Sequence, residues 1–235
     1  MTVGYTKIRD LTSAELSLVP NDEREREFGS SKRRQQFLCG RSLLRLMLQN
    51  RSGKPAAGHC LIAAKGGKPE CVGGPAVSIT HAGDSVACCI ADAGEVGIDL
   101  EVIGERRDPI KIAAKFFSKE EADWLGTQPQ DRFFMLWVLK EAYLKALGRS
   151  IFGGLNQFCC RVRPPVIETI RMSEHMRELC LYVMGDSILA LATTEAALTA
   201  VTFGRWEPGA AELEASNDFH LLARSEELAE NYATE

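Results

Sequence analysis

Two carboxylates alternate with apolar residues on a short segment that the sequence predicts to be a strand. In residues 96–101, Asp99 and Glu101 would project from one face together with Gly97. The opposite face would be apolar, with Val96, Ile98 and Leu100. Two carboxylates beside a residue without a side chain would offer oxygen ligands to a hard cation.

Further along the chain, a predicted helix from Arg132 to Leu147 carries Glu141 and Lys145. Four residues apart, these two side chains would share one helix face. Considered alone, the two strand carboxylates would indicate only a solvent-exposed strand face. The Glu141 and Lys145 pair would indicate only a side-chain interaction that stabilises the helix. Taken together, a cation site and a nearby lysine suit phosphate chemistry.

The elements that must position these residues alternate between helices and strands in both halves of the chain. Ser30 or Ser31 is predicted to cap a helix that runs to about Leu48. Short strands follow, including a predicted hairpin of residues 85–91 and 95–101. The second half repeats the order, with predicted helices at 109–115, from Ser118 and at 132–147, then strands at 158–162, 178–184, 188–194 and 200–206. This order predicts an α+β fold.

The bulk composition limits the class of protein. A chain of 235 residues with 45% hydrophobic content can bury one core or two small ones. A net charge of −4 argues against nucleic-acid binding by bulk electrostatics. The N-terminus lacks a signal-peptide pattern and the apolar runs are too short to cross a membrane, so we expect a cytoplasmic protein. The eight cysteines lack Cys-x-x-Cys spacing and are expected to be buried free thiols.

Three motifs give the chain a family resemblance. Gly-x-Asp-x-Glu from Gly97, Phe-Phe-Ser-Lys-Glu-Glu from Phe116, and Trp-x-x-Lys-Glu-Ala-x-x-Lys-x-x-Gly from Trp137 occur in this order. The pattern resembles the 4′-phosphopantetheinyl transferases of the surfactin-synthetase-activating type, over roughly residues 25–160. The resemblance implies two similar α+β subdomains related by a pseudo-twofold, with coenzyme A in the cleft between them. We expect the divisions to be residues 1–103, 104–208 and an acidic tail, 209–235.

The resemblance also implies roles for the charged residues. Asp99, Glu101 and Glu141 match the family's metal ligands, and their oxygens favour Mg²⁺, with Mn²⁺ a plausible substitute. Glu141 also matches a candidate general base for the acceptor serine, and Lys145 matches a lysine that contacts the phosphates. The implied reaction moves the phosphopantetheine arm of coenzyme A onto a carrier-protein serine and expels 3′,5′-ADP.

Further basic residues are implied to bind coenzyme A. Arg33 and Arg41, on the predicted N-terminal helix, would lie roughly 12 Å apart along it. The alternative to a nucleotide contact is that these arginines lie on a solvent-exposed helix face. Lys68 lies in a Gly-Lys-Pro sequence that matches a family loop. Thr80 and His81 belong to a sequence that resembles the family's Ser-His-Ser-Gly.

That last resemblance is incomplete, because Ala82 stands where the family has its second serine, which removes one hydrogen bond. Residues 153–155 resemble the segment near which carrier proteins dock.

Two residues, Glu121 and Lys140, keep two interpretations each, and a third, Trp137, has one. Glu121 either closes a capping box with Ser118 or approaches the metal through water. Lys140 is either a solvated lysine or a partner of the site. Trp137 is expected in the core, because it lies on the apolar face of the predicted helix.

The implied partners are coenzyme A and an apo acyl or peptidyl carrier protein, with the chain itself a monomer and no nucleic acid or membrane involved. Two alternatives remain open. A catalytically inactive member would bind coenzyme A or a carrier without transfer, which intact carboxylates and Lys145 argue against. An unrelated Mg²⁺-dependent phosphohydrolase would pass the group to water instead of a serine.

Overall fold

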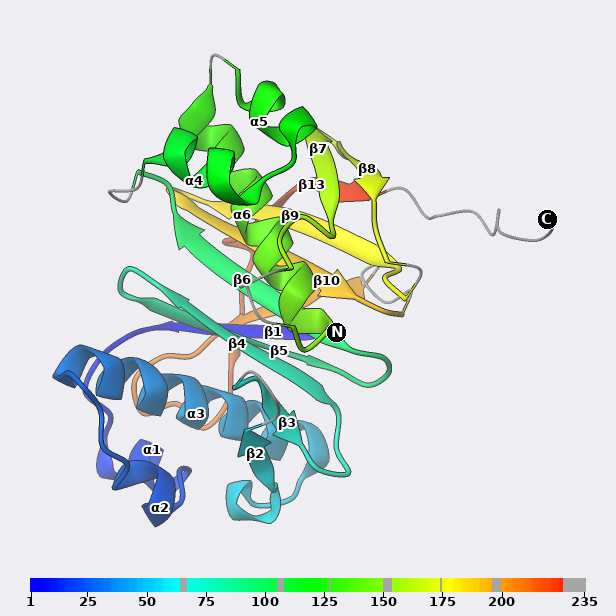
Figure 1. Ribbon diagram of the computed structural model, residues 1–235. Coiled ribbons are helices and arrows are strands. Elements are labelled where there is room, and N and C mark those ends of the chain that lie inside the picture. Colours follow the sequence, from blue (N-terminus) through cyan, green and yellow to red (C-terminus); the bar gives the residue numbers. More distant parts are fainter. Residues whose placement is uncertain are drawn as a thin grey trace.

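Two β-sheets pack face to face at the centre of the molecule, and a long helix covers the outer side of each (Figure 1). The computed structural model describes residues 1–63, 67–104, 108–126, 128–149, 154–173, 175–195 and 200–225. The layers run in the order helix α3, first sheet, second sheet, helix α6. This arrangement confirms the predicted α+β class, while the pseudo-twofold relation of the halves stays a prediction.

The first sheet combines both ends of the chain. Its strands, in spatial order, are β12 (Glu214–Ala215), β11 (Thr202–Arg205), β1 (Thr2–Lys7), β5 (Ser85–Ala91) and β4 (Ala76–Ala82). β1 pairs in parallel with β11 and antiparallel with β5, and β4 and β5 form a hairpin. A separate two-stranded ribbon joins β2 (Leu61–Ala63) to β3 (Pro69–Cys71).

The second sheet contains the strand that carries the two carboxylates. Its spatial order is β6 (Val96–Val102), β10 (Ser187–Thr193), β9 (Glu178–Met184), β13 (His220–Ser225), β8 (Val166–Arg171) and β7 (Cys159–Arg163). β6 is an edge strand of this sheet and packs beside β4, the edge strand of the first.

The helices follow the predicted capping signals. Ser30 caps α3 (Ser31–Ser52), where its Oγ accepts a hydrogen bond from Arg33 N at 3.3 Å. α6 (Pro129–Ala146) begins with proline at its first turn and is buried along most of its length. The remaining helices are α1 (Ser13–Ser17), α2 (Asn21–Arg24), the 3₁₀ helix η1 (Ala56–Gly58), α4 (Pro109–Phe116) and α5 (Lys119–Leu125).

Three apolar clusters correspond to the three interfaces between layers. One lies between α3 and the first sheet, one between the sheets, and one between α6 and the second sheet. The predicted apolar face of β6, with Ile98 and Leu100, belongs to the middle cluster. The other face of β6 therefore points towards α6.

The predicted hairpin of residues 85–91 and 95–101 is wrong. β5 pairs with β4 and β1, whereas β6 pairs with β10. The turn near Gly94, which has φ +67°, carries the chain from the first sheet to the second. A local turn signal cannot distinguish a hairpin from such a crossing, because the partners that decide it are distant in sequence.

The sheets also cross the predicted domain boundaries. β6, expected in the segment 1–103, belongs to the second sheet, and β11, expected in 104–208, belongs to the first. In the expected acidic tail from residue 209, β12 joins the first sheet and β13 inserts between β9 and β8. Residues 214–225 are therefore partly sheet, and the last ten residues of the chain lie outside the described ranges.

All eight cysteines are free thiols, as predicted. Seven of them are buried, but the prediction of burial is wrong for Cys60, which is exposed. Among the described residues, no helix combines the length and apolarity needed to cross a membrane.

Candidate active site

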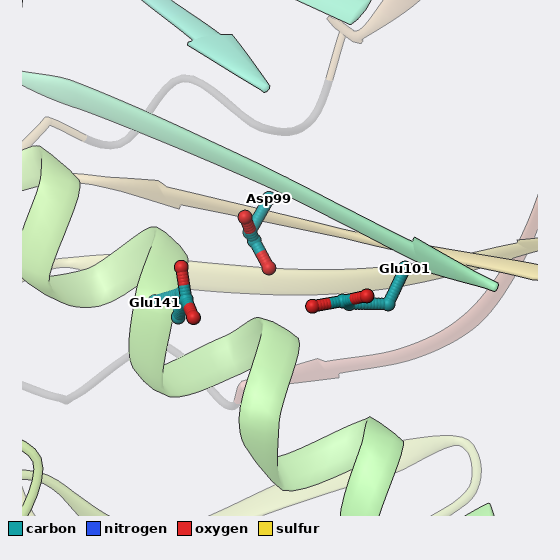
Figure 2. Close-up of side chains that lie close together, drawn as sticks. All are labelled: Asp99, Glu101 and Glu141. Carbon is teal, nitrogen blue, oxygen red and sulfur yellow. The ribbon is translucent and has the colours of Figure 1, made fainter. Parts of the chain in front are cut away.

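Asp99, Glu101 and Glu141 converge where α6 crosses β6 (Figure 2). One carboxylate oxygen from each lies within 4.8 Å of the others. Asp99 and Glu101 are buried and come from the strand, and Glu141 comes from the facing helix. We call these three residues the carboxylate trio.

Gly97 allows this convergence, because a side chain at that position would strike α6. A Cβ on Gly97 would overlap the Ala142 carbonyl oxygen and lie 2.5 Å from Ala146 N. Both are backbone atoms, so the helix could not accommodate it by turning a side chain. The glycine that shares a face with Asp99 and Glu101 is thus the point where helix and strand meet.

Lys145 reaches the trio from one turn further along α6. Its Nζ lies 2.6 Å from Asp99 Oδ1 and donates a second bond to Ile98 O at 3.1 Å. Partial burial disfavours its charge, but the carboxylates of Asp99, Glu141 and Glu101 outweigh this and raise its pKa. Lys145 is therefore a firmly protonated ammonium beside the trio.

One oxygen of the trio is left open for a ligand. Asp99 Oδ1 accepts from Lys145 and from Thr80 Oγ1, but Asp99 Oδ2 is buried and has no hydrogen-bond partner among the described residues. A buried carboxylate oxygen without a partner is costly unless a cation or donor occupies the site. Three carboxylates with such an oxygen fit a hard divalent cation.

The β4 edge holds the trio through hydroxyl groups. Thr80 Oγ1 accepts from Leu100 N at 3.2 Å, and Ser78 Oγ accepts from Ile98 N at 3.3 Å. These side chains take the place of a backbone ladder between β4 and β6. Thr80, predicted to contact coenzyme A, is thus seen to orient Asp99 by a 3.1 Å hydrogen bond.

His81 follows Thr80 on β4, within electrostatic reach of Lys145 and Asp99. Partial desolvation of its ring and then the charge of Lys145 lower its pKa, so the imidazole is mainly neutral at pH 7. A neutral imidazole offers one donor and one acceptor rather than a positive charge.

Lys68 lies near the site but the N-terminal arginines do not share its cavity. Lys68 lines a cavity together with Lys145, and its Nζ lies 2.7 Å from Glu95 Oε2. Arg41 is buried, 3.6 Å from Glu23, and burial lowers its pKa. Arg33 is exposed in the first turn of α3. The lining of that cavity includes neither arginine.

Glu121 and Lys140 form a buried ion pair of 2.8 Å away from solvent. Glu121 closes the capping box with Ser118 and also accepts from Cys160 N, which confirms the capping interpretation. Lys140 Nζ donates to Leu155 O at 2.6 Å and to Phe158 O. The pair therefore links α5 and α6 to the segment that follows α6. Gly153, in the segment that resembles the carrier-docking region, lies outside the described residues.

Trp137 makes a contact that its sequence position did not predict. It lies in the core as predicted, stacked on Phe133 with ring centroids 5.6 Å apart. Its Nε1 also donates to Glu101 Oε1 at 3.1 Å. The helical spacing of apolar residues that predicted a core position for Trp137 gave no signal for this bond, because Glu101 is distant in sequence.

Comparison with known proteins identifies the segment that carries the trio. The model of the 4′-phosphopantetheinyl transferase superfamily matches residues 95–199. A putative 4′-phosphopantetheinyl transferase of Synechocystis is 33% identical over 132 residues, covering 53% of this chain and 54% of that protein. The 4′-phosphopantetheinyl transferase of Bacillus pumilus is 38% identical over 102 residues, 42% of each chain.

A third relative, the 4′-phosphopantetheinyl transferase AcpT of Salmonella typhimurium, is 34% identical over 124 residues, or 50% of this chain and 61% of that protein. The chain thus spans about half the length of the curated relatives it matches.

Proposed function

Because the chain belongs, through residues 95–199, to the 4′-phosphopantetheinyl transferase superfamily, we propose that it transfers 4′-phosphopantetheine from coenzyme A to a serine of an apo acyl or peptidyl carrier protein. The observation that carries this proposal is the carboxylate trio beside the protonated Lys145. We further propose that the enzyme is cytoplasmic and monomeric, and that transfer needs neither a nucleic acid nor a membrane.

Asp99, Glu101 and Glu141 would hold Mg²⁺, with Mn²⁺ as a substitute. The buried, unpartnered Oδ2 of Asp99 supports this assignment. A bound cation would neutralise charge on the donor phosphates. Trp137 and Thr80 would keep the ligands Glu101 and Asp99 in place through their hydrogen bonds.

In the reaction, the serine oxygen forms a bond to the β-phosphorus of coenzyme A, and the bond from that phosphorus to the bridging oxygen breaks. The leaving group is 3′,5′-ADP. Glu141 accepts the serine proton, directly or through a water, and Lys145 neutralises charge on the phosphates. Lys68 and His81 would contact the nucleotide end of the donor, together with Arg33 and Arg41 if the donor extends to α3.

Chromatographic measurement of 3′,5′-ADP release tests this proposal against its two alternatives. With coenzyme A and Mg²⁺, release that depends on an apo carrier and equals the carrier converted supports a transferase. Equal release without any carrier indicates a phosphohydrolase. Coenzyme A binding without release under either condition indicates an inactive binding protein.

A further inference from the structure

A third basic residue joins Lys68 and Lys145 around the same cavity. This cavity has a volume of about 160 Å³ and is lined by Arg149 in addition to the two lysines. We infer that Arg149 binds a phosphate group of the donor substrate. The inference rests on the proposed function, and it adds a binding residue that lies beyond the helix carrying Glu141 and Lys145.

The end of α6 determines where Arg149 lies. Gly148 adopts φ +61°, a left-handed conformation that glycine favours, and Arg149 N donates to Leu144 O at 2.8 Å. This backbone turn closes the helix and folds the chain back over its last turn. The Arg149 side chain consequently lines the cavity beside Lys145.

The Arg149 side chain is held by an uncharged partner. Its Nη1 donates to Gln157 Oε1. In the described part of the chain, Lys68 is paired with Glu95 and Lys145 with Asp99, whereas the partner of Arg149 is a neutral amide. Of the three basic groups, Arg149 is therefore the one whose charge its described partner does not neutralise.

Gln157 is itself positioned from inside the protein. It lies between Leu155 and Phe158, whose carbonyl oxygens accept hydrogen bonds from the buried Lys140. Lys140 in turn is paired with Glu121. The guanidinium is thus oriented by a segment that is fixed to the core, which lowers the entropy lost when it binds an anion.

The spacing along α6 gives the direction of the substrate. Glu141 and Lys145 are separated by four residues, about 6 Å along the helix, and Arg149 follows four residues later. Lys145 connects the two places, because its Nζ contacts Asp99 of the trio and its side chain lines the cavity together with Arg149 and Lys68. A donor with its reacting phosphate at the trio would extend its outer phosphates past Lys145 into this cavity, where a planar guanidinium can bind two oxygens at once.

Titration calorimetry of coenzyme A and of 3′,5′-ADP with Mg²⁺ tests the inference on wild type, Arg149→Ala and Arg149→Lys. Arg163→Ala is the matched control, because this substitution removes the same charge from an exposed position on β7, the edge strand farthest from β6 in the second sheet. Arg149→Ala should weaken binding about tenfold or more, as expected for a charge-assisted contact. Arg149→Lys should recover part of this loss, and Arg163→Ala should bind like wild type.

Dephospho-coenzyme A then identifies the phosphate. If Arg149 binds the 3′-phosphate, its replacement should have little effect on dephospho-coenzyme A; if it binds the pyrophosphate, the tenfold loss should persist, and both results support the inference. Arg149→Ala binding coenzyme A as tightly as wild type would overturn it while leaving the proposed function intact. A wild-type chain that binds no coenzyme A would overturn the proposed function and this inference together.

Discussion

Trp137 Nε1 donates a 3.1 Å hydrogen bond to Glu101 Oε1, so a residue of the α6 core holds one carboxylate of the trio. The indole ring is anchored by Phe133 and the carboxylate by β6. Helix and strand are thus joined at the position where a ligand needs a fixed direction. Changing a partner that orients a metal ligand typically lowers metal affinity or activity about 10- to 100-fold.

Trp137→Phe should keep the ring in the core and remove only this hydrogen bond. We expect the Mg²⁺ concentration for half-maximal transfer to rise about 10- to 100-fold. Trp206→Phe is the control, since Trp206 also loses an Nε1 bond, to Ala210 O at 3.0 Å, in the first sheet's outer cluster. An unchanged Mg²⁺ dependence in Trp137→Phe would contradict the role given to this bond.

Gly97→Ala should separate α6 from β6. The new methyl group would collide with the Ala142 carbonyl oxygen, so we expect unfolding free energy to fall by about 1–3 kcal/mol and transfer to be lost. Urea unfolding and a transfer assay measure the two effects. Gly29→Ala, where the methyl would meet no atom within 4 Å, should change neither; a Gly97→Ala protein as stable and active as Gly29→Ala would refute the steric argument.

Lys140→Met should destabilise the fold strongly, because it leaves the Glu121 charge buried without its partner. Removing one member of a buried pair costs about 3–5 kcal/mol. Adding Glu121→Gln should restore part of that loss in urea unfolding, so the two changes should not be additive.

The exposed pair of Lys119 and Asp123, 2.7 Å apart, provides the control. Lys119→Met should change the free energy of unfolding far less than Lys140→Met, because solvent screens an exposed ion pair. Equal losses at Lys119 and Lys140, or strictly additive effects of Lys140→Met and Glu121→Gln, would show that burial of the pair carries no energetic weight.

Glu15 should make stability depend on pH in the acid range. Burial opposes its charge, but hydrogen bonds from Arg9, Gly209 N and Thr12 N outweigh it and lower its pKa to about 2. A lowered pKa stabilises the folded state above the ordinary value near 4.5, and this contribution is lost as pH falls from 4.5 towards 2. Above pH 4.5, the lowered pKa of Glu15 contributes about 3 kcal/mol to the free energy of unfolding.

The measurement is the difference in unfolding free energy between wild type and Glu15→Gln. It should be largest at pH 6 and shrink below pH 4.5. Asp123→Asn, which removes an exposed carboxylate, should give a small difference at every pH. A Glu15→Gln difference that stays constant from pH 6 to pH 3 would rule out this account.

The sequence predicted the elements whose signals are local. The Ser30 cap, the α6 helix and the alternation in β6 all depend on neighbours within a few residues, and each is present. The hairpin of β5 and β6 failed because strand partners are decided by long-range packing. β13 was missed because His220–Ser225 is short and is stabilised by pairing with two distant strands.

The same distinction applies to the site. Asp99, Glu101 and Glu141 could be grouped from residue type, spacing and family resemblance, and the structure brings them together. The bond from Trp137 to Glu101 and the cavity position of Arg149 depend on contacts between elements far apart in the sequence. The burial of Arg41 against Glu23 could not be predicted either, because an amphipathic helix pattern does not tell which arginine faces a neighbouring helix.

The most direct test of the central claim is the intact mass of several apo acyl and peptidyl carrier proteins after incubation with this protein, coenzyme A and Mg²⁺. We predict that at least one carrier gains the mass of one phosphopantetheine arm, that the same carrier with its acceptor serine changed to alanine gains nothing, and that Asp99→Ala abolishes the gain. A mass gain on the serine-free carrier, or one that persists with Asp99→Ala, would contradict the assignment of the carboxylate trio as a transferase centre.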